Sequence, residues 1–260
     1  EIVSRDWSSD VCSSDLGMED PIRTGVEESV ALARTAGIRV LMVTGDYRGT
    51  AESIARSIGI TDIRVIEGAE LQQYDDAGIR ACVKSNTVFA RIRPQDKLRI
   101  IDALKANGDV TAMIGDGVND APALKRADIG IVVGTASDVA KEIADLILLD
   151  NNFSTVVASI EEGRVIFDNI RKVVAYVLSD SFAEVLTIFG AMLLGWPTPL
   201  LVAQILWIHL ICDGPEDIVL GFEPKEQGIM ERPPRALQES ILDRFGARLI
   251  ATISGLSALF

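Results

Sequence analysis

Residues 112–122 read AMIGDGVNDAP, and this stretch decides the fold. The apolar run 110–114 predicts a buried strand, and the Gly-Asp-Gly that follows it predicts a tight turn before a helix. Asp116 and Asp120 are therefore expected at the carboxyl end of a strand, where open α/β sheets bind their ligands. Paired carboxylates there suit Mg²⁺ held together with a phosphate group. A capped turn in a Gly/Asp-rich loop is the simpler alternative.

The surrounding chain alternates strands with helices up to residue 149. This alternation predicts a Rossmann-like parallel sheet covered by helices on both faces. The expected strands are 38–43, 63–66, 88–90, 110–114, 129–133 and 146–149, and the expected helices are 22–36, 49–58, 94–106, 121–127 and 137–144.

The pattern changes after residue 150. Residues 153–172 are helical and mixed in polarity, whereas 173–195 are apolar apart from two acidic residues, and 200–222 are apolar again. Residues 245–260 begin a further apolar helix. Stretches of this length predict helices that cross a membrane. The fold class is thus an α/β domain followed by an α-helical transmembrane segment.

Composition limits the possible functions. The 260 residues carry a formal net charge of −13, which argues against binding to the nucleic-acid backbone. The three cysteines, Cys12, Cys82 and Cys212, form no CxxC pair, so a reducing compartment is favoured over a disulfide framework. Residues 1–16 have no signal-peptide pattern and look like a foreign leader, and they are left out of the fold prediction.

Three polar groups are expected at the carboxyl edge of the sheet. Residues 44–46 (Thr-Gly-Asp) offer a hydroxyl and backbone N–H groups at a helix start, which suits a phosphate. Lys97 begins a helix, where an ammonium group can neutralise a transferring phosphoryl group. With Asp116 and Asp120, this order of residue types matches the needs of phosphoryl transfer. Taken singly, Thr44 also fits a helix cap and Lys97 a solvated helix position.

Charged groups inside the apolar stretches form a second candidate site. Charges within a bilayer are costly and usually face partners, ions or water. Their hard oxygen ligands favour a divalent cation such as Ca²⁺, although carboxylates that are protonated or paired within the helices are the alternative. The candidate ligands are Ser181, Glu184, His209, Cys212 and Asp213, and weaker candidates that could reach a membrane interface are Asp180, Glu216 and Asp217.

Three runs resemble the phosphorylation domain of the P-type ATPases, which has the haloacid-dehalogenase-like fold. They are MVTGD at 42–46, FARIRPQDK at 89–97 and MIGDGVNDAPAL at 113–124. The resemblance covers roughly residues 17–260 and continues through DNNFST at 150–155 and EEGR at 161–164. Because these blocks keep the order and approximate spacing of the family, the resemblance is specific.

The resemblance implies roles for individual residues. Thr44 and Gly45 would bind the phosphoryl group, and Asp46 would lie on the nucleotide side. Arg91 and Lys97 would contact ATP or phosphoryl oxygens. Asp116 would hold Mg²⁺, and Asn119 and Asp120 would brace that site. The phosphorylated aspartate of the family, in an Asp-Lys-Thr-Gly-Thr motif, occurs nowhere in these residues. We therefore expect a fragment of a pump that is inactive by itself.

The membrane half also resembles the calcium pumps among these ATPases. SDSFAEV at 179–185 is similar to their fifth helix, QILWIHLICDGP at 204–215 to their sixth, and MERPPR at 230–235 to the loop that follows. Glu184 and Asp213 are retained. Ser181 and His209 stand where these pumps have Asn, and Cys212 stands where they have Thr. Since His and Cys are softer ligands, Mn²⁺ or another transition ion stays open. Taken alone, His209 also fits a hydrogen bond to a neighbouring helix, and Cys212 a small buried hydrophobe.

The sequence thus predicts part of an ATP-driven P-type pump for a divalent cation, with Ca²⁺ as the first candidate. It would be a multi-pass membrane protein with a cytoplasmic α/β domain at 17–152 and stalk and membrane helices at 153–260. Expected cofactors and partners are Mg²⁺, ATP, the transported cation, the lipid bilayer and the remaining pump domains, without nucleic acid. The alternatives are a membrane-anchored phosphohydrolase of the same fold, for which no upstream DxD motif is visible, and a non-catalytic membrane module.

Overall fold

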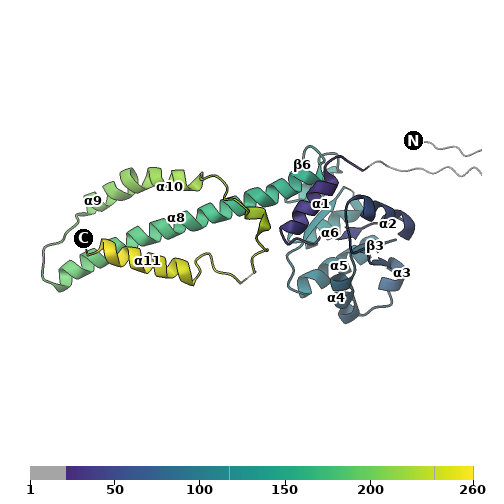
Figure 1. The fold of residues 1–260 in the computed structure, drawn as a ribbon, viewed down its shortest axis with the longest axis horizontal. Helices are drawn as coiled ribbons and strands as arrows, with labels where there is room; N and C mark the ends of the chain where they lie inside the picture. The colour runs from purple at the N-terminus through teal and green to yellow at the C-terminus, as the bar shows by residue number, and fades with distance from the viewer. Residues whose placement is uncertain (1–21, 117, 237, 260) are drawn as a thin grey trace, which may run out of the picture. The chain divides into compact units, whose positions relative to one another are not determined.

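A computed structural model describes residues 22–116, 118–236 and 238–259 (Figure 1). The expected leader at 1–16 lies outside the described residues. The chain forms two compact units. The first comprises the described residues up to Ala31 together with Arg39–Ser154, and the second comprises Leu32–Ile38 together with the residues from Thr155 onward.

The first unit contains two parallel sheets of three strands each. One has the order β1 (Met42–Val43), β3 (Val88–Ala90), β2 (Val65–Glu67), and the other has the order β4 (Ala112–Gly115), β5 (Ile129–Val133), β6 (Leu146–Leu148). The prediction of parallel strands is confirmed. The strand expected at 38–43 is shorter, because only Met42 and Val43 find ladder partners, on Val88 and Phe89.

Helices connect these strands in the order that the alternation predicts. They are α1 (Val26–Thr35), α2 (Arg48–Ser57), α3 (Gly68–Leu71), α4 (Asp76–Ser85), α5 (Pro94–Ala106), the 3-10 turn η1 (Val118–Asp120), α6 (Ala121–Arg126) and α7 (Asp138–Ile143). Pro94 and Pro122 lie in the first turns of α5 and α6, where a missing N–H has no cost.

Helices α3 and α4 lie between the expected strands 63–66 and 88–90, where the sequence predicted no helix. Helix α4 buries Ile79, Cys82 and Val83 at the i, i+3, i+4 spacing of one helix face. The Asp75 carboxylate caps it by accepting a hydrogen bond from the Gly78 N–H at 2.7 Å. The helix packs into an apolar cluster around Phe89, which is fully buried on β3.

The second unit is helical. The helix α8 (Phe153–Leu193) runs without a break for 41 residues and spans both the mixed-polarity and the apolar parts of the expected stretch 153–195. Then follow α9 (Val202–Trp207), the π-helical turn η2 (Ile208–Asp213), α10 (Gly214–Gly221), the 3-10 turn η3 (Ile229–Glu231) and α11 (Arg244–Ser257). Figure 1 shows η2–α10 on one side of α8 and α11 on the other, and Ser254 of α11 donates a hydrogen bond to the Ser179 carbonyl at 2.8 Å.

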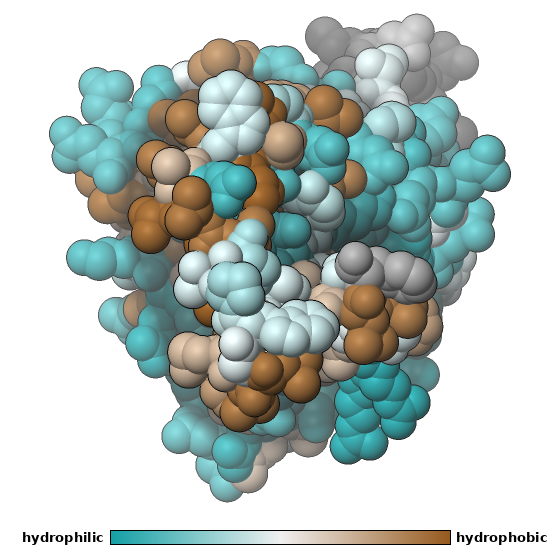
Figure 2. Space-filling model, turned by 90° about the vertical axis from the view of Figure 1, so that its left-hand side faces the viewer, coloured by the Kyte–Doolittle hydropathy of each residue, from teal (hydrophilic) through white to brown (hydrophobic). Residues whose placement is uncertain are grey.

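Helix α8 is the one helix among the described residues that is long and apolar enough to cross a membrane. Large apolar side chains are exposed along this unit, including Phe189, Met192, Leu206, Trp207 and Val219. Figure 2, seen from the end of the view where α9 and the last turns of α8 lie, shows hydrophobic residues gathered on that surface. Exposed apolar patches of this extent mark contact with a membrane or another apolar surface.

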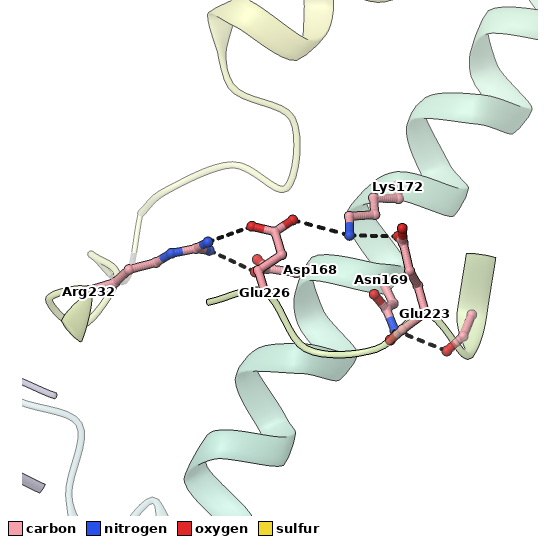
Figure 3. Close-up of polar contacts among 7 residues, drawn as sticks. Asp168, Asn169, Lys172, Glu223, Glu226 and Arg232 are labelled. Atoms are coloured by element: carbon pink, nitrogen blue, oxygen red, sulfur yellow. Dashed lines mark hydrogen bonds and ion pairs between the residues drawn. The ribbon is translucent and has the colours of Figure 1, made fainter. Parts of the chain in front are cut away.

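Polar contacts fix the connection between α10 and α11 against α8 (Figure 3). The Arg232 guanidinium contacts Asp168 at 2.8 Å and Glu226 at 2.6 Å. The Lys172 ammonium contacts Glu223 at 2.7 Å and Glu226 at 3.2 Å. One helix face of α8 therefore holds residues 223–232 of this connection through a network of charges.

Candidate functional site

The loop after β1 forms one half of the first candidate site. The Thr44 hydroxyl donates to the Asp46 carboxylate at 2.7 Å, and the Asp46 N–H donates back to the Thr44 hydroxyl at 3.1 Å. Two backbone bonds tie this loop to the loop after β3, since Arg91 N–H donates to the Asp46 carbonyl and Ile92 N–H to the Thr44 carbonyl. Gly45 lies between them, and a Cβ added to it would meet no atom within 4 Å. The Thr-Gly-Asp loop is thus held in place, with Gly45 and Asp46 exposed.

Arg91 is held in an unusual backbone conformation next to this loop. Its φ of 51° lies in the left-handed region, which costs energy for a residue with a side chain. The guanidinium carbon lies 4.7 Å from the centre of the Tyr47 ring, and a Cβ on Gly68 would come within 2.5 Å of the Arg91 carbonyl. Neither Tyr47 nor Gly68 carries a sequence signal for this role.

Lys97 and Asp120 form the second half. Lys97 lies in the first turn of α5, and its ammonium is 2.5 Å from Asp120 Oδ1. Both side chains are mostly buried, with 17% and 11% exposed, so the pair is protected from solvent screening. Gly115 makes room for it, because an added Cβ there would lie 2.8 Å from the Asp120 Cβ.

Asp116 and Asn119 are exposed on the loop that follows β4. Among the described residues, no hydrogen bond or ion pair is found for the Asp116 carboxylate, while its backbone carbonyl accepts from the Ser137 N–H at 3.4 Å. A free carboxylate directly after a strand, next to a buried Lys–Asp pair, has the chemistry that Mg²⁺ needs. Asp116 therefore fits the metal, whereas one oxygen of Asp120 is already bound to Lys97.

Helix α5 relates the two halves along the chain. It begins three residues after Arg91, which contacts the Thr44 loop, and carries Lys97 to Asp120. The structure thus groups Thr44, Asp46 and Arg91 around one sheet, and Lys97, Asp116 and Asp120 around the other. Both groups lie at the carboxyl ends of parallel strands, as the sequence predicted, but on two three-stranded sheets where a single sheet was expected.

The second candidate site is centred on His209 in the π-helical turn η2. Its Nε2 lies 3.1 Å from Glu184 Oε2, and its Nδ1 lies 3.0 Å from Asp213 Oδ2 and 3.9 Å from Asp180 Oδ2. The residues Asp180, His209 and Asp213 offer ligand atoms that all lie within 4.8 Å of one another. A π-helical turn is rare and often occurs at functional sites.

Not every predicted ligand joins this cluster. Cys212 is exposed, and no contact of the Ser181 side chain is found within the described part of the chain. Asp180, a weaker candidate from the sequence, is part of the cluster. Tyr176 was missed altogether, although its hydroxyl contacts Glu216 at 2.6 Å and Asp213 at 3.2 Å. Its only sequence signal is a tyrosine one helical turn before Asp180.

Comparisons with known proteins agree with both halves of the chain. Residues 11–128 match a family described as haloacid dehalogenase-like hydrolase, and residues 98–160 match a second family of that description. Residues 197–260 match the family described as cation transporting ATPase, C-terminus. The chain belongs to the P-type cation-transporting ATPases.

Three relatives of this P-type ATPase chain illustrate the similarity. It is 44% identical over 229 residues to calcium-transporting ATPase 1 of Bacillus cereus, covering 87% of this chain and 26% of the relative. It is 44% identical over 232 residues to calcium-transporting ATPase 1 of Yarrowia lipolytica, covering 87% and 25%. It is 42% identical over 234 residues to the endoplasmic reticulum-type calcium-transporting ATPase 4 of Arabidopsis thaliana, covering 87% and 22%.

The P-type ATPase chain therefore spans about a quarter of the length of the curated relatives that it matches. Among solved structures, the catalytic domain of the CPx-ATPase CopB-B is 27% identical, with a TM-score of 0.43 over 56% of this chain and 48% of that one.

Proposed function

We propose that this chain is part of an ATP-driven pump that moves a divalent cation, with Ca²⁺ as the first candidate, across a membrane. The observation that supports this proposal most is the cluster of Glu184, His209 and Asp213 between helices with exposed apolar surfaces. The same chain also holds a Lys97–Asp120 pair at the end of a parallel sheet. The names of the relatives, all calcium-transporting ATPases, support Ca²⁺.

The residues at the sheet edge would divide the work of phosphoryl transfer. The Thr44 hydroxyl and the Gly45 N–H bind phosphoryl oxygens, while Asp46, which accepts the Thr44 hydrogen bond, lies on the nucleotide side. Arg91 and Lys97 add positive charge beside ATP. The buried pair with Asp120 orients Lys97, and Asn119 braces the same loop. Preorganised charges of this kind stabilise a transition state without rearrangement.

Asp116 is the residue proposed to hold Mg²⁺. When bound, the ion neutralises negative charge on the phosphoryl oxygens. The acceptor aspartate does not come from an Asp-Lys-Thr-Gly-Thr motif of these 260 residues, so we assign it to the remainder of the pump. The remaining pump domains are therefore obligatory partners, together with ATP.

In the membrane, the proposed pump is a multi-pass protein with its α/β unit in the cytoplasm. Helix α8 would transmit movement toward Glu184 when the acceptor is phosphorylated, because it carries that residue on the same unbroken helix as the polar network around Lys172. Ion binding and phosphorylation would thereby be coupled.

Phosphorylation of the full-length pump tests this proposal. We expect Asp116→Ala to abolish phosphoenzyme formation from radiolabelled ATP, because the Mg²⁺ ligand is lost. Asp138→Ala removes another exposed carboxylate, at the start of α7, and should leave phosphorylation intact. Normal phosphoenzyme levels in the Asp116 variant would refute the assignment. Hydrolysis of p-nitrophenyl phosphate by the 260-residue chain alone would instead favour a phosphohydrolase.

A further inference from the structure

Two arginines lie beside the Thr-Gly-Asp loop at 44–46, and they differ in what holds their side chains. The Arg48 guanidinium pairs with the Glu52 carboxylate at 3.0 Å, one helical turn further along α2. The Arg91 guanidinium lies over the Tyr47 ring, with its carbon 4.7 Å from the ring centre. Within the described part of the chain, no ion pair or side-chain hydrogen bond is found for Arg91. Arg91 is thus held by an aromatic face in place of a carboxylate.

An aromatic partner has a different effect on an arginine than a carboxylate has. The π electrons of the ring attract the guanidinium, but they do not neutralise its charge. A carboxylate partner cancels that charge and accepts up to two of the five N–H donors. Tyr47 therefore keeps the Arg91 side chain in place and leaves its charge and its donors for a ligand that carries anionic oxygens.

The backbone of Arg91 is fixed as well. Its φ of 51° lies in the left-handed region, and its N–H donates to the Asp46 carbonyl at 2.9 Å. Gly68 packs closely from the other side, since an added Cβ there would lie 2.5 Å from the Arg91 carbonyl oxygen. A residue with a side chain keeps this conformation only where its surroundings hold it, and such residues cluster at functional sites. The direction in which the Arg91 side chain leaves the backbone is therefore set by the fold.

Tyr47 occupies a position that does not suit a tyrosine on local grounds. It is the N-cap residue of α2, and its side chain makes no capping hydrogen bond. Ser, Thr, Asp and Asn are preferred at an N-cap, because their oxygen accepts a hydrogen bond from the first helical turn. The tyrosine is also 68% exposed, so burial does not explain it. The contact with Arg91 is the interaction that the ring makes, and a local choice that conflicts with capping is expected at functional positions.

The pair lies next to the loop that is proposed to bind phosphoryl oxygens. Tyr47 directly follows Asp46 in the chain, and the Ile92 N–H, one residue after Arg91, donates to the Thr44 carbonyl at 3.0 Å. The guanidinium is planar and matches the geometry of phosphate oxygens, which it can bind through two parallel hydrogen bonds. The ligand chemistry that fits the free side of Arg91 is thus a phosphate group.

We propose that Tyr47 is a positioning residue, which holds the Arg91 guanidinium in the place where it binds phosphate oxygens of the nucleotide. This inference rests on the proposed function, because it deepens the assignment of Arg91 to ATP. A long side chain that is already ordered loses less freedom when the ligand binds, so its order raises affinity. A cation–π contact at an exposed ring corresponds to a factor of about 2 to 5 in affinity.

Phosphorylation of the full-length pump over a range of ATP concentrations tests this inference. Tyr47→Ser removes the ring and supplies a residue that caps α2. We expect the ATP concentration that gives half of the maximal phosphoenzyme to rise about 2- to 5-fold, while the midpoint of thermal unfolding does not fall. Phosphoenzyme formed from inorganic phosphate should be unchanged, because no nucleotide takes part in that reaction. A merely structural role for Tyr47 would instead lower the unfolding midpoint and impair both reactions.

Three further variants serve as controls. Tyr47→Phe keeps the ring and should restore the ATP dependence of the unaltered pump. Tyr74→Ser removes another exposed tyrosine of the same unit, which contacts neither arginine through its ring, and should leave the ATP dependence unchanged. In a pump that already carries Arg91→Met, Tyr47→Ser should cause no further rise, because the side chain that it positions is absent.

The outcomes separate this inference from the proposed function. An unchanged ATP dependence in Tyr47→Ser, or an equal rise in the Arg91→Met background, overturns the role of Tyr47 and leaves the pump standing. A loss of phosphorylation from inorganic phosphate in Tyr47→Ser also overturns that role. If the unaltered full-length protein forms no phosphoenzyme from ATP, both the inference and the proposed function are overturned.

Discussion

Single residues show how closely the loop after β4 is packed. Gly115 ends β4, and the Asp120 side chain occupies the space into which a Cβ at position 115 would project. Asp120 in turn holds the Lys97 ammonium. The glycine is therefore required by a neighbouring side chain, since its own backbone is not in the left-handed region.

Gly115→Ala should consequently separate Lys97 from Asp120. We expect a loss of about 1 to 3 kcal/mol in the free energy of unfolding, the usual cost of overpacking, and a sharp fall in phosphoenzyme formation in the full-length pump. Gly49→Ala is the matched control, because Gly49 lies in α2 with no atom within 4 Å of its added Cβ. It should stabilise the chain slightly, by up to about 1 kcal/mol. If the two variants had the same free energy of unfolding and the same phosphoenzyme level, the close packing of Gly115 against Asp120 would be contradicted.

Asp128 gives a prediction for pH. The Lys105 ammonium and the Thr111 N–H lower the pKa of its carboxyl group below the ordinary value. A lowered folded-state pKa means that the stabilisation is present above the ordinary pKa and is lost as pH falls through the lowered one. Asp128→Asn should therefore cost about 1 kcal/mol near neutral pH, since the side chain is a third exposed, and the cost should vanish in acid. Denaturant unfolding at pH 7 and pH 2.5 measures this, and a cost independent of pH would contradict it.

At the scale of elements, the connection between α10 and α11 is held by backbone carbonyl acceptors as well as by charges. The Arg164 guanidinium donates to the carbonyls of Ile229 at 2.8 Å, Arg232 at 2.9 Å and Ala36 at 2.8 Å. The Arg235 guanidinium lies over the Phe167 ring at 3.6 Å. One arginine of α8 thus satisfies carbonyls from two separate segments of its unit.

Arg164→Met should release this connection. Loss of three charge-assisted hydrogen bonds leaves carbonyls without a donor, so we expect faster amide hydrogen exchange in residues 229–235. Lys225→Met removes only an ion pair of which the lysine side chain is 61% exposed, and its effect on exchange should be small. Hydrogen–deuterium exchange of both variants in detergent measures whether Arg164 holds residues 229–235. Unchanged hydrogen exchange in the Arg164 variant would mean that the ion pairs shown in Figure 3 hold the connection without Arg164.

Elements also show what the sequence could predict. Strands β3 and β5 and helix α5 have the predicted bounds, because buried apolar runs and Pro94 give strong local signals. Helix α4 was missed because its single buried face lies among polar residues. The π-helical turn at 208–213 could not be predicted, since it depends on tertiary contacts of His209 with α8. The pairing of Lys97 with Asp120 could not be predicted for the same reason. The sequence shows the order of the two residues in the chain, but their contact depends on the fold.

At the scale of the whole molecule, the proposed function requires that phosphoryl transfer at the sheet edge be linked to a cation in the membrane. Glu184 is the residue where that link can be measured. It lies on α8 and contacts His209, whichever cation the cluster binds.

Glu184→Gln in the full-length pump should weaken the dependence of phosphorylation on Ca²⁺ by about 10-fold or more, because a carboxylate beside the ion is lost. Phosphorylation chemistry itself should persist at saturating Ca²⁺, since Asp116 and Lys97 are unchanged. Glu161→Gln, which removes a carboxylate of the same helix that pairs with the exposed Lys225, serves as the control. A titration of phosphoenzyme against Ca²⁺ gives the apparent affinity, and an undiminished affinity in the Gln variant would refute the role of Glu184.

The unbroken helix α8 has a further consequence for the angular position of its side chains. Each residue turns an α-helix by about 100° and advances it by about 1.5 Å. Lys172, which anchors the polar network, and Glu184, which contacts His209, therefore keep a fixed azimuth relative to each other. One inserted residue between them would rotate Glu184 away from His209, whereas seven would nearly restore its direction. The number of residues between Lys172 and Glu184 is therefore constrained as well as their residue types.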